Sequence, residues 1–372
     1  MGSAHPALLP WLAVAVACLL DRLIGDPPGW LHPVQVMGWW IAVLRQRAEA
    51  WAGDQPWRLR LAGGLITVLL VGGSGGLGWA LESLARSQPL IGQPLLLLAL
   101  ASCLAGESLD RAVRGVLAGL AGRKAGADKA GAASDGPSEH GLERARARLA
   151  WIVGRDVENL DGAGILRAAA ETAAENGVDG LFAPLFWMLV GAGLGGFGLW
   201  GVGLWGATPN PGEGFLPGPL TLAWAYKASS TLDSMLGYRR GRLQWLGTAG
   251  ARLDDLLTWL PCRFVALSLP LVSGRGLQAW GQVGCAFREG RSDPSPNAGL
   301  SQAAYAQAAQ VQLGGVNHYR GERRLKPLLG VGFAAVDQAG VERILSLNKR
   351  LEVAWLLMAL ALALLADRVL AQ

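Results

Sequence analysis

Three carboxylates recur at intervals of four residues in the segment G-I-L-R-A-A-A-E-T-A-A-E-N-G-V-D-G, residues 164 to 180. On a helix, Glu171, Glu175 and Asp179 share one face, and Arg167 lies one turn before them. Like charges at this spacing destabilise a helix by about a few tenths of a kcal/mol per pair. The row therefore predicts a cation held between the acids, either Mg²⁺ or a substrate amine. The alternative is the solvated face of an amphipathic helix, and the spacing alone leaves both open.

Further charged residues lie inside or beside apolar stretches, where each costs free energy and usually persists for function. Asp254 and Asp255 abut an apolar helix in A-R-L-D-D-L-L-T-W-L-P, and Lys227 and Asp233 share the segment A-Y-K-A-S-S-T-L-D-S-M-L. The alternative is that these charged side chains lie at the ends of helices, at the level of the lipid headgroups. For Asp254 and Asp255, each taken singly, we favour that alternative.

Polar turns supply a second kind of candidate group. Asp26 and His32 occupy a turn broken by prolines, where the alternative for a lone histidine is a structural hydrogen bond. The stretches S-D-P-S-P-N-A-G (292–299) and G-G-V-N-H-Y-R-G-E (314–322) bracket a helix of Ala and Gln. Backbone N–H groups of such loops at a helix N-terminus can cradle an anion.

Two familiar motifs are excluded. Gly191, Gly193 and Gly196 match G-x-G-x-x-G, but they lie within an apolar span and follow no strand, so close helix packing is favoured over dinucleotide binding. No G-x-x-x-x-G-K-[ST] loop occurs, so any ATP is not held by a Walker A motif. The four cysteines form no C-x-x-C pair and predict neither a disulfide framework nor a zinc site.

The composition identifies the elements that must position these groups. Of 372 residues, 51% are hydrophobic and 16% are charged, and the mean hydropathy is +0.30. These values exclude disorder, a coiled coil or a polar repeat array for most of the chain. Sixteen tryptophans are typical of membrane–water interfaces. We predict an all-α integral membrane protein, because helices satisfy their own backbone groups in lipid. It would be a helical bundle with re-entrant or buried helices and two long polar, mainly helical cytoplasmic loops.

Six apolar stretches have the length that a bilayer requires. They are Leu8 to Ile24, Leu61 to Leu84, Pro89 to Ala105, Leu181 to Trp205, Leu256 to Val272 and Leu351 to Leu370. Two shorter stretches, Trp30 to Leu44 and Pro219 to Leu236, contain charged residues, His or Pro and are predicted to be re-entrant or buried helices.

The polar regions complete the predicted domain organisation. We predict a single membrane-embedded catalytic domain over 1–372. Residues 121–141 are rich in Gly, Ala and Ser and predict a disordered linker, after which helical patterning runs from Leu142 through Ala174. Residues 142–180 and 273–350 are the predicted active-site regions.

The basic residues predict the orientation in the membrane. The net charge is +5 and the sequence pI is about 9.3, but Lys and Arg flank apolar segments rather than form one polar face. This favours the positive-inside rule over a nucleic-acid partner. The loop before Leu61 and the region after Ala105 would be cytoplasmic, and one segment between 219 and 272 would not span. We predict a multi-pass protein of the cytoplasmic (inner) membrane, with its active site facing the cytoplasm.

Several long blocks resemble the CobD/CbiB family of cobalamin biosynthesis, the membrane-bound adenosylcobinamide-phosphate synthases. The blocks are D-R-L-I-G-D-P-P-G-W-L-H-P-V, I-V-G-R-D, A-A-A-E-T-A-A-E-N-G-V-D-G-L-F-A-P-L-F, Y-K-A-S-S-T-L-D-S-M-L-G-Y, A-R-L-D-D-L-L-T-W-L-P-C-R, S-P-N-A-G and L-G-G-V-N-H-Y-R-G. They cover nearly the whole chain in order, apart from the linker. One small departure is L-T-W after Asp254 and Asp255, where a polar residue is expected.

The resemblance implies a reaction. A propionate carboxylate of adenosylcobyric acid would be joined, as an amide, to (R)-1-amino-2-propanol or its O-phosphate, with ATP and Mg²⁺. The partners would be these small molecules and the lipid bilayer. Assembly of several copies into a homo-oligomer is left open.

The resemblance also implies a set of site residues, which we expect to gather in one pocket at the inner leaflet. Glu171, Glu175 and Asp179 would handle Mg²⁺ or the amine. Arg155 and Lys227 would contact phosphates, and Asn297, Asn317 and Tyr319 would hydrogen-bond substrate amides or phosphate. The remaining candidates are Asp26, His32, Asp156, Asn176, Asp233, Ser234 and Asp255.

Two other function classes fit parts of the sequence. Gly-interrupted spans with intramembrane polar residues suit a transporter of a corrinoid or related solute, although we see no inverted repeat. A scaffold for other corrin enzymes is the third interpretation, and the acid row argues against scaffolding as the sole function.

Overall fold

The computed structural model describes residues 8–27, 29, 32–121, 138–196, 216–276 and 278–370. Its contacts divide the chain into two compact units. Unit 1 comprises Met1–Ala105, Asp179–Pro261 and Val353–Gln372, and unit 2 comprises Gly106–Val178 and Cys262–Glu352. Most of the predicted disordered linker lies outside the described residues. Whether the two units act as a single catalytic domain, as predicted, stays a prediction.

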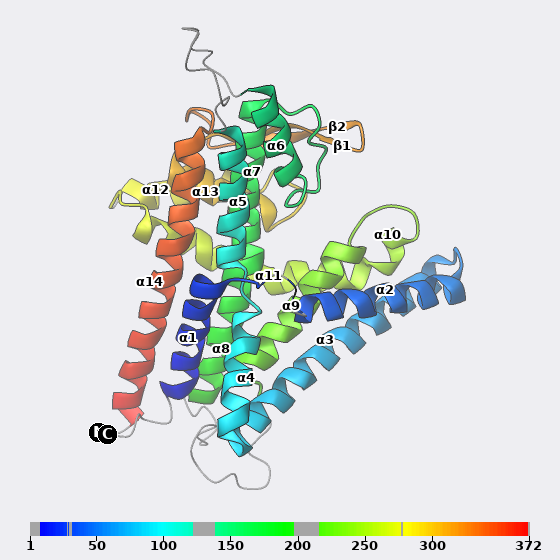
Figure 1. Cartoon of the computed structure of the whole chain (residues 1–372), viewed down its shortest axis with the longest axis vertical. Helices are drawn as coiled ribbons and strands as arrows, with labels where there is room; N and C mark the ends of the chain where they lie inside the picture. The colour runs from blue at the N-terminus through cyan, green and yellow to red at the C-terminus, as the bar shows by residue number, and fades with distance from the viewer. Residues whose placement is uncertain are drawn as a thin grey trace. The chain divides into compact units, whose positions relative to one another are not determined.

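Unit 1 is built of helices (Figure 1). They are α1 (Leu9–Ile24), α2 (Pro33–Ala52), α3 (Pro56–Ser87), α4 (Pro89–Ala101), α8 (Ala183–Gly196), α9 (Pro219–Leu236) and α10 (Leu243–Leu246). The helices α11 (Thr248–Val272) and α14 (Gln338–Leu370) contribute residues to both units, as does a short π-helix, η3 (Val178–Phe182).

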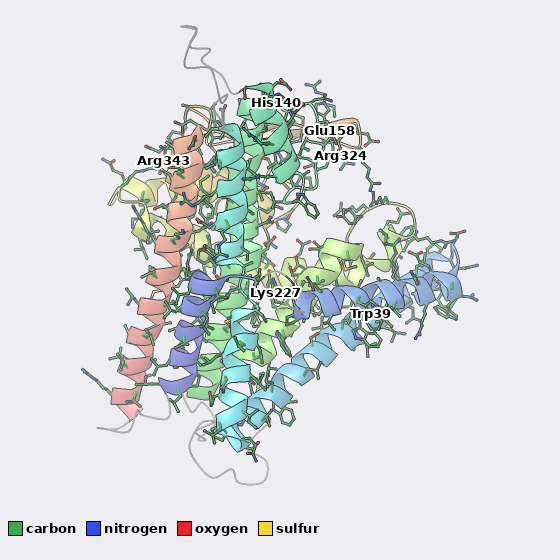
Figure 2. All side chains as sticks on the ribbon, in the orientation of Figure 1. Trp39, His140, Glu158, Lys227, Arg324 and Arg343 are labelled. Atoms are coloured by element: carbon green, nitrogen blue, oxygen red, sulfur yellow. The ribbon has the colours of Figure 1, made fainter. Side chains whose placement is uncertain are left out.

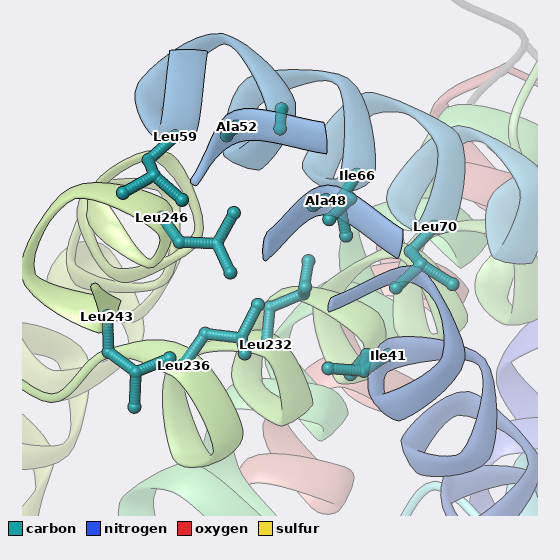
Figure 3. Packing of buried hydrophobic residues seen from close by; sticks show 11 residues of the cluster. Ile41, Ala48, Ala52, Leu59, Ile66, Leu70, Leu232, Leu236, Leu243 and Leu246 are labelled. Carbon is teal, nitrogen blue, oxygen red and sulfur yellow. The ribbon is translucent and has the colours of Figure 1, made fainter. Parts of the chain in front are cut away.

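The core of unit 1 forms where α2, α3, α9 and α10 pack together (Figure 3). On α3, Leu59, Ile66 and Leu70 recur at helical spacing and are buried against Leu232 of α9. Close approach requires a residue without a side chain at Gly63, because a Cβ there would lie 1.9 Å from the carbonyl oxygen of Leu246. This packing surrounds α9 and confirms it as a buried helix.

The first turn of α9 is capped by a side chain from α3. Glu82 is buried, and its carboxylate accepts hydrogen bonds from the backbone N–H groups of Gly218, Leu220 and Thr221 at 3.2, 2.7 and 3.2 Å. The hydroxyl of Thr221 donates a further bond at 2.8 Å. A carboxylate is well placed there because the first N–H groups of a helix have no partner within it.

Small residues also bring α8 close to α9, as predicted for the glycines of the apolar span. A Cβ at Gly191 would lie 2.4 Å from the carbonyl carbon of Gly218, so the two backbones pack directly. The packing interpretation is confirmed at this position.

Unit 2 combines helices with a β-hairpin. Its helices are α5 (Gly106–Leu120), α6 (Glu139–Leu149), α7 (Gly162–Gly177), α12 (Gln278–Gly290) and α13 (Ala298–Ala309). The strands β1 (Leu313–Tyr319) and β2 (Glu322–Leu329) pair antiparallel. Asn348 of α14 ties two helices together: its side chain accepts a hydrogen bond from Tyr305 and donates one to the carbonyl of Ala173 at 3.1 Å.

Two details of the predicted secondary structure are corrected. The segment G-G-V-N-H-Y-R-G-E was expected to be a loop, but it forms β1 and the turn into β2. The helical patterning from Leu142 to Ala174 is interrupted by a connection at 150–161. In that connection Asp161 caps α7 by accepting a hydrogen bond from the N–H of Gly164 at 2.7 Å, which is why a new helix begins there.

Four helical stretches among the described residues are long and apolar enough to cross a membrane. They are Pro56–Ser87, Pro89–Leu120, Gly162–Leu194 and Thr248–Val272. The predicted spans Leu61 to Leu84, Pro89 to Ala105 and Leu256 to Val272 lie within three of them, and the fourth holds much of the described part of Leu181 to Trp205. The chain is an all-α membrane protein with one small hairpin, and the predicted fold class is confirmed.

The two terminal spans are helical but are not among these four. With 16 residues, α1 is shorter than the roughly 20 residues that a span needs. The apolar part of α14 carries Glu352, Asp367 and Arg368.

Candidate functional site

A buried ion pair lies at the centre of unit 2. The guanidinium of Arg155 is 2.5 Å from the carboxylate of Glu171, and their side chains are 7% and 0% exposed. Glu171 comes from the middle of α7, whereas Arg155 comes from the connection before it. Two charges that are removed from water need further hydrogen bonds to be tolerated.

The β1 strand supplies those hydrogen bonds. The N–H of Gly314 donates to Glu171 at 2.8 Å, and Arg155 donates to the side-chain oxygen of Asn317 at 2.9 Å. The amide nitrogen of Asn317 is buried and has no hydrogen-bond partner among the described residues. Arg155, Glu171 and Asn317 therefore form one buried polar group, which we call the Arg155 cluster.

Asp156 fixes the hairpin beside this cluster. Its carboxylate accepts hydrogen bonds from the N–H groups of Arg320 and Gly321 at 2.8 and 2.7 Å. These two donors hold the pKa of Asp156 below its usual value of 3.8. Both Arg320 and Gly321 have positive φ angles, so the tight turn between β1 and β2 needs such an anchor. In this structure Asp156 positions the hairpin.

A second polar group lies where α7 and α13 meet β2. Gln302 of α13 donates a hydrogen bond to Glu175 at 2.6 Å, and the ammonium of Lys326 is 3.4 Å from the carboxylate of Asp293. Burial lowers the pKa of Lys326, but the charges of Glu175 and Asp293 outweigh it and raise that pKa above 10.5. Lys326 therefore stays charged and compensates for the two acids.

A cleft of about 750 Å³ opens in unit 2 between the start of α7 and β1. Its polar lining includes Asp156, Glu158, Asp161, Arg167 and His318. Arg167 donates a hydrogen bond to the carbonyl of Val316 at 2.7 Å, while its buried Nε has no hydrogen-bond partner among the described residues. Glu158, labelled in Figure 2, is exposed at the rim. The cleft thus offers both carboxylates and a cation to a polar ligand.

The predicted row of three acids runs across two kinds of helix, and whether the three share one face stays a prediction. The regular turns of α7 end at Gly177, and Asp179 lies in η3, whose i→i+5 hydrogen bonds change the angular step between residues. Glu171 and Glu175 belong to unit 2, whereas Asp179 belongs to unit 1. Throughout the described ranges, no group of three or more His, Cys, Asp or Glu side chains is placed to hold a metal ion. The three carboxylates do not form a ready-made magnesium site, because Arg155 and Gln302 already engage two of them.

Unit 1 has its own charged cluster, around Lys227 of α9 (labelled in Figure 2). Its ammonium interacts electrostatically with the carboxylates of Asp26, Asp179 and Asp254, and Asp254 interacts with Asp233 in turn. Carboxylates outnumber the lysine in this group, which we call the Lys227 cluster.

Tyr226 braces the Lys227 cluster from the neighbouring position on α9. Its hydroxyl hydrogen-bonds the carbonyl of Asp179 at 3.3 Å and the hydroxyl of Thr258 at 3.2 Å. These bonds tie the start of η3 to α11 within unit 1.

His32 has a structural task at the start of α2. Its Nδ1 accepts a hydrogen bond from the N–H of Val34 at 3.3 Å, and its Nε2 is 3.3 Å from the carboxylate of Asp26. The imidazole therefore caps α2 and holds Asp26 beside it.

A family model described as CobD/Cbib protein matches residues 14–348. The chain belongs to the CobD/CbiB family. The cobalamin biosynthesis protein CobD of Synechocystis sp. is 38% identical over 98% of this chain and 96% of its own length. CbiB of Salmonella typhi is 34% identical, and CobD of Klebsiella pneumoniae is 35% identical, each over 95% of both chains. No match is found among solved structures.

Membership of the CobD/CbiB family supports a biosynthetic role in the cobalamin pathway. The residues that the sequence singled out divide between the two units of this CobD/CbiB chain. Those in unit 2 are Arg155, Asp156, Glu171, Glu175, Asn176, Asn297, Asn317 and Tyr319. Those in unit 1 are Asp26, His32, Asp179, Lys227, Asp233, Ser234 and Asp255. Their meeting in a single pocket stays a prediction.

Some of these residues lie apart from both clusters of the CobD/CbiB chain. Asn297 holds its loop against α11 by accepting a hydrogen bond from Arg263 at 2.8 Å. The ring of Tyr319 lies 5.6 Å from the guanidinium carbon of Arg324, which is labelled in Figure 2. Asn176 and Ser234 are exposed, and the hydroxyl of Ser234 donates to the carbonyl of Ser230 at 2.9 Å.

Sequence reasoning missed several residues that the CobD/CbiB fold brings into these groups. Lys326 ends the charged run E-R-R-L-K and Gln302 lies in the helix of Ala and Gln, but neither stretch indicates which distant side chain it would contact. Arg167 did have a sequence signal, because it lies one helical turn before Glu171. The structure places it in the lining of the cleft. Glu82 had a usable signal, since a single acid within an apolar span is costly.

Proposed function

We propose that this CobD/CbiB chain is an adenosylcobinamide-phosphate synthase, an ATP-dependent acid–amine ligase. It would join a propionate carboxylate of adenosylcobyric acid to (R)-1-amino-2-propanol or its O-phosphate. The observation that supports the proposal best is the Arg155 cluster, next to a polar cleft in the same unit. A buried charge pair contributes little to stability, so a functional reason for keeping it is favoured.

The proposed chemistry needs a leaving group on the carboxylate. One carboxylate oxygen attacks the γ-phosphorus of ATP, the bond to ADP breaks, and an acyl phosphate forms. The neutral amine then attacks the acyl carbon, inorganic phosphate leaves, and a protein carboxylate takes the proton of the amine. Cationic side chains stabilise the charge on the transferred phosphoryl group.

The donors around the cleft fit a nucleotide phosphate. Arg167 has a buried N–H without a hydrogen-bond partner in the described part of the chain, and a phosphate oxygen would satisfy it. Mg²⁺ is bound in such sites by one or two carboxylates together with substrate phosphates, so a cluster of three protein acids is not required. Glu158 and Asp161 are the cleft carboxylates that would hold it, and the ion would neutralise the phosphate charge.

The Lys227 cluster fits the amine. Its carboxylates outnumber its single ammonium, so a protonated amine would find a favourable field there. In this proposal Asp179 or Asp254 accepts the proton before the amine reacts. The inner membrane, with the site on its cytoplasmic face, is the expected location because ATP is supplied there.

The experiment that tests the function is product analysis by mass spectrometry. Purified full-length protein is incubated with adenosylcobyric acid, Mg-ATP and each amine in turn. A product heavier by the amine less water, formed only with ATP, supports the synthase. No product with either amine, together with transport of intact corrinoid in a vesicle flux assay, would favour a transporter instead.

A further inference from the structure

A polar pocket of about 320 Å³ lies in unit 1. None of the residues of the Lys227 cluster lines it. It is formed by the first turns of α3 and α11 together with the connection that leads from α9 through α10. Three arginines line it: Arg60 from α3, Arg239 from the connection and Arg252 from α11. Asp255 is the only carboxylate among the described residues of the lining. The pocket therefore has an excess of positive charge.

The arginine from α3 is exposed, but its guanidinium has a stacking partner. The guanidinium of Arg60 stacks on the ring of Trp245 from α10 at 4.4 Å. Stacking of this kind orients a planar guanidinium and leaves its N–H edge available for an anion. A flexible surface arginine would first lose side-chain entropy on binding, so this contact favours a built site.

The pocket also depends on close backbone packing. A Cβ at Gly247 would lie 1.9 Å from the carbonyl oxygen of Leu236, and a Cβ at Gly237 would lie 2.7 Å from the carbonyl oxygen of Asp233. Both glycines line the pocket. A side chain at either glycine would therefore disturb the packing beside the pocket.

The surroundings match the headgroup region of a bilayer. Arg60 lies in the first two turns of the candidate span Pro56–Ser87, and Arg252 in those of Thr248–Val272. Next to Arg60, Arg58 lies over the rings of Trp51 and Trp57 at 5.7 and 5.4 Å, and both rings are exposed. Exposed tryptophans beside arginines at the end of a span are typical of the interface.

We propose that Arg60, Arg239 and Arg252 form a binding pocket for a phosphate group. Arginine is the residue best suited to this ligand, because its planar fork can donate two parallel hydrogen bonds to phosphate oxygens. The phosphate can come from the headgroup of an anionic phospholipid or from a soluble phosphate compound. The proposal does not depend on the synthase reaction.

The test measures binding to the full-length protein in two arms. In the lipid arm, protein in nanodiscs of phosphatidylcholine, with or without phosphatidylglycerol, is followed by thermal unfolding and by native mass spectrometry of retained lipid. In the soluble arm, protein in a zwitterionic detergent is titrated with inorganic pyrophosphate. The test variant is R60Q/R239Q/R252Q, and the matched control is Arg47→Gln, an exposed arginine of α2 outside the pocket.

One of the two probes is expected to raise the unfolding temperature of the wild type and of R47Q. The affinity of the triple variant for that probe should fall at least tenfold, about 1.4 kcal/mol. Response to phosphatidylglycerol alone would identify a lipid headgroup, and response to pyrophosphate alone would identify a soluble ligand. Binding of neither probe by the wild type, or equal binding by the triple variant, would overturn the proposal. If the triple variant does not fold, Trp245→Leu and Arg239→Gln are compared with R47Q under the same criterion.

Discussion

Arg155 and Glu171 form a buried ion pair whose further partners come from a strand more than 140 residues away, since Gly314 donates to the same carboxylate. The carboxylate of Glu171 therefore already has a cation and a hydrogen-bond donor from the protein. Its charge is already balanced, and its position holds α7, the preceding connection and β1 together. This arrangement allows the structural task of the pair and its proposed catalytic task to be separated by experiment.

Removing only one member of the pair should be far more damaging than removing both. Arg155→Met leaves a buried carboxylate without its cation and should lower the free energy of unfolding by about 3–5 kcal/mol. The double variant Arg155→Met/Glu171→Leu should recover much of that loss. Denaturant unfolding in detergent measures both values, and the proposed synthase activity should remain low in the double variant. A stable and fully active double variant would show that the pair has no catalytic task.

Asp156 should make the anchoring of the hairpin pH-dependent at low pH only. Its pKa is lowered in the folded protein, so its stabilising effect is present above the ordinary value of 3.8 and is lost as the pH falls through the lowered value. Amide hydrogen exchange at Arg320 and Gly321 should therefore show protection at neutral pH that disappears in strong acid. In Asp156→Asn, protection should already be weak at neutral pH and should change little with pH. Equal protection in the variant and the wild type would contradict this role.

Glu82 should be required for a stable α9. Glu82→Ala removes the acceptor of several N–H groups and should cost about 1–2 kcal/mol, the upper range for loss of a helix cap. Gly218→Ala should act in the same direction, because its Cβ would lie 2.6 Å from the Glu82 carboxylate carbon. The control is Glu322→Gln, an exposed acid on β2. Thermal unfolding in detergent is the measurement, and a Tm unchanged from that of E322Q would refute the capping role.

Glu175 and Asp179 should each matter for the reaction. Glu175→Gln and Asp179→Asn each keep the shape of the side chain but remove its charge. Glu175 accepts a hydrogen bond from Gln302, and Asp179 interacts electrostatically with Lys227. The proposed synthase activity should fall by about 10²-fold or more if either acts in proton transfer or amine binding. Circular dichroism and membrane insertion are measured in parallel. Full activity in a folded and inserted variant would remove that residue from the site.

The hairpin shows why part of the site could not be predicted. Gly314 has a positive φ, and a Cβ there would lie 1.9 Å from the carbonyl oxygen of Pro327, so the two strands approach closely at this glycine. The sequence shows two adjacent glycines in a polar region, which is equally typical of a loop. Strand pairing depends on a partner segment, and no local pattern specifies that partner.

Asp179 shows a feature of local structure that helical periodicity does not predict. A spacing of four residues indicates a face shared with Glu175, but it carries no signal for a change of helix type. In the structure Asp179 lies in the π-helix Val178–Phe182, which follows directly on α7.

The amino-acid sequence by itself determined the class of this protein and most of its helices. Apolar stretches of bilayer length, interrupted by caps, glycines and prolines, act locally, and lipid permits few alternatives to a helix. The blocks shared with the CobD/CbiB family likewise marked Arg155, Glu171 and Asn317 before their contacts were known. Only the tertiary structure decided that Arg155 neutralises Glu171, that Glu82 caps α9 and that three arginines surround one pocket. These relationships join residues far apart in the chain, and their energies depend on desolvation and close approach, which exist only once the chain has folded.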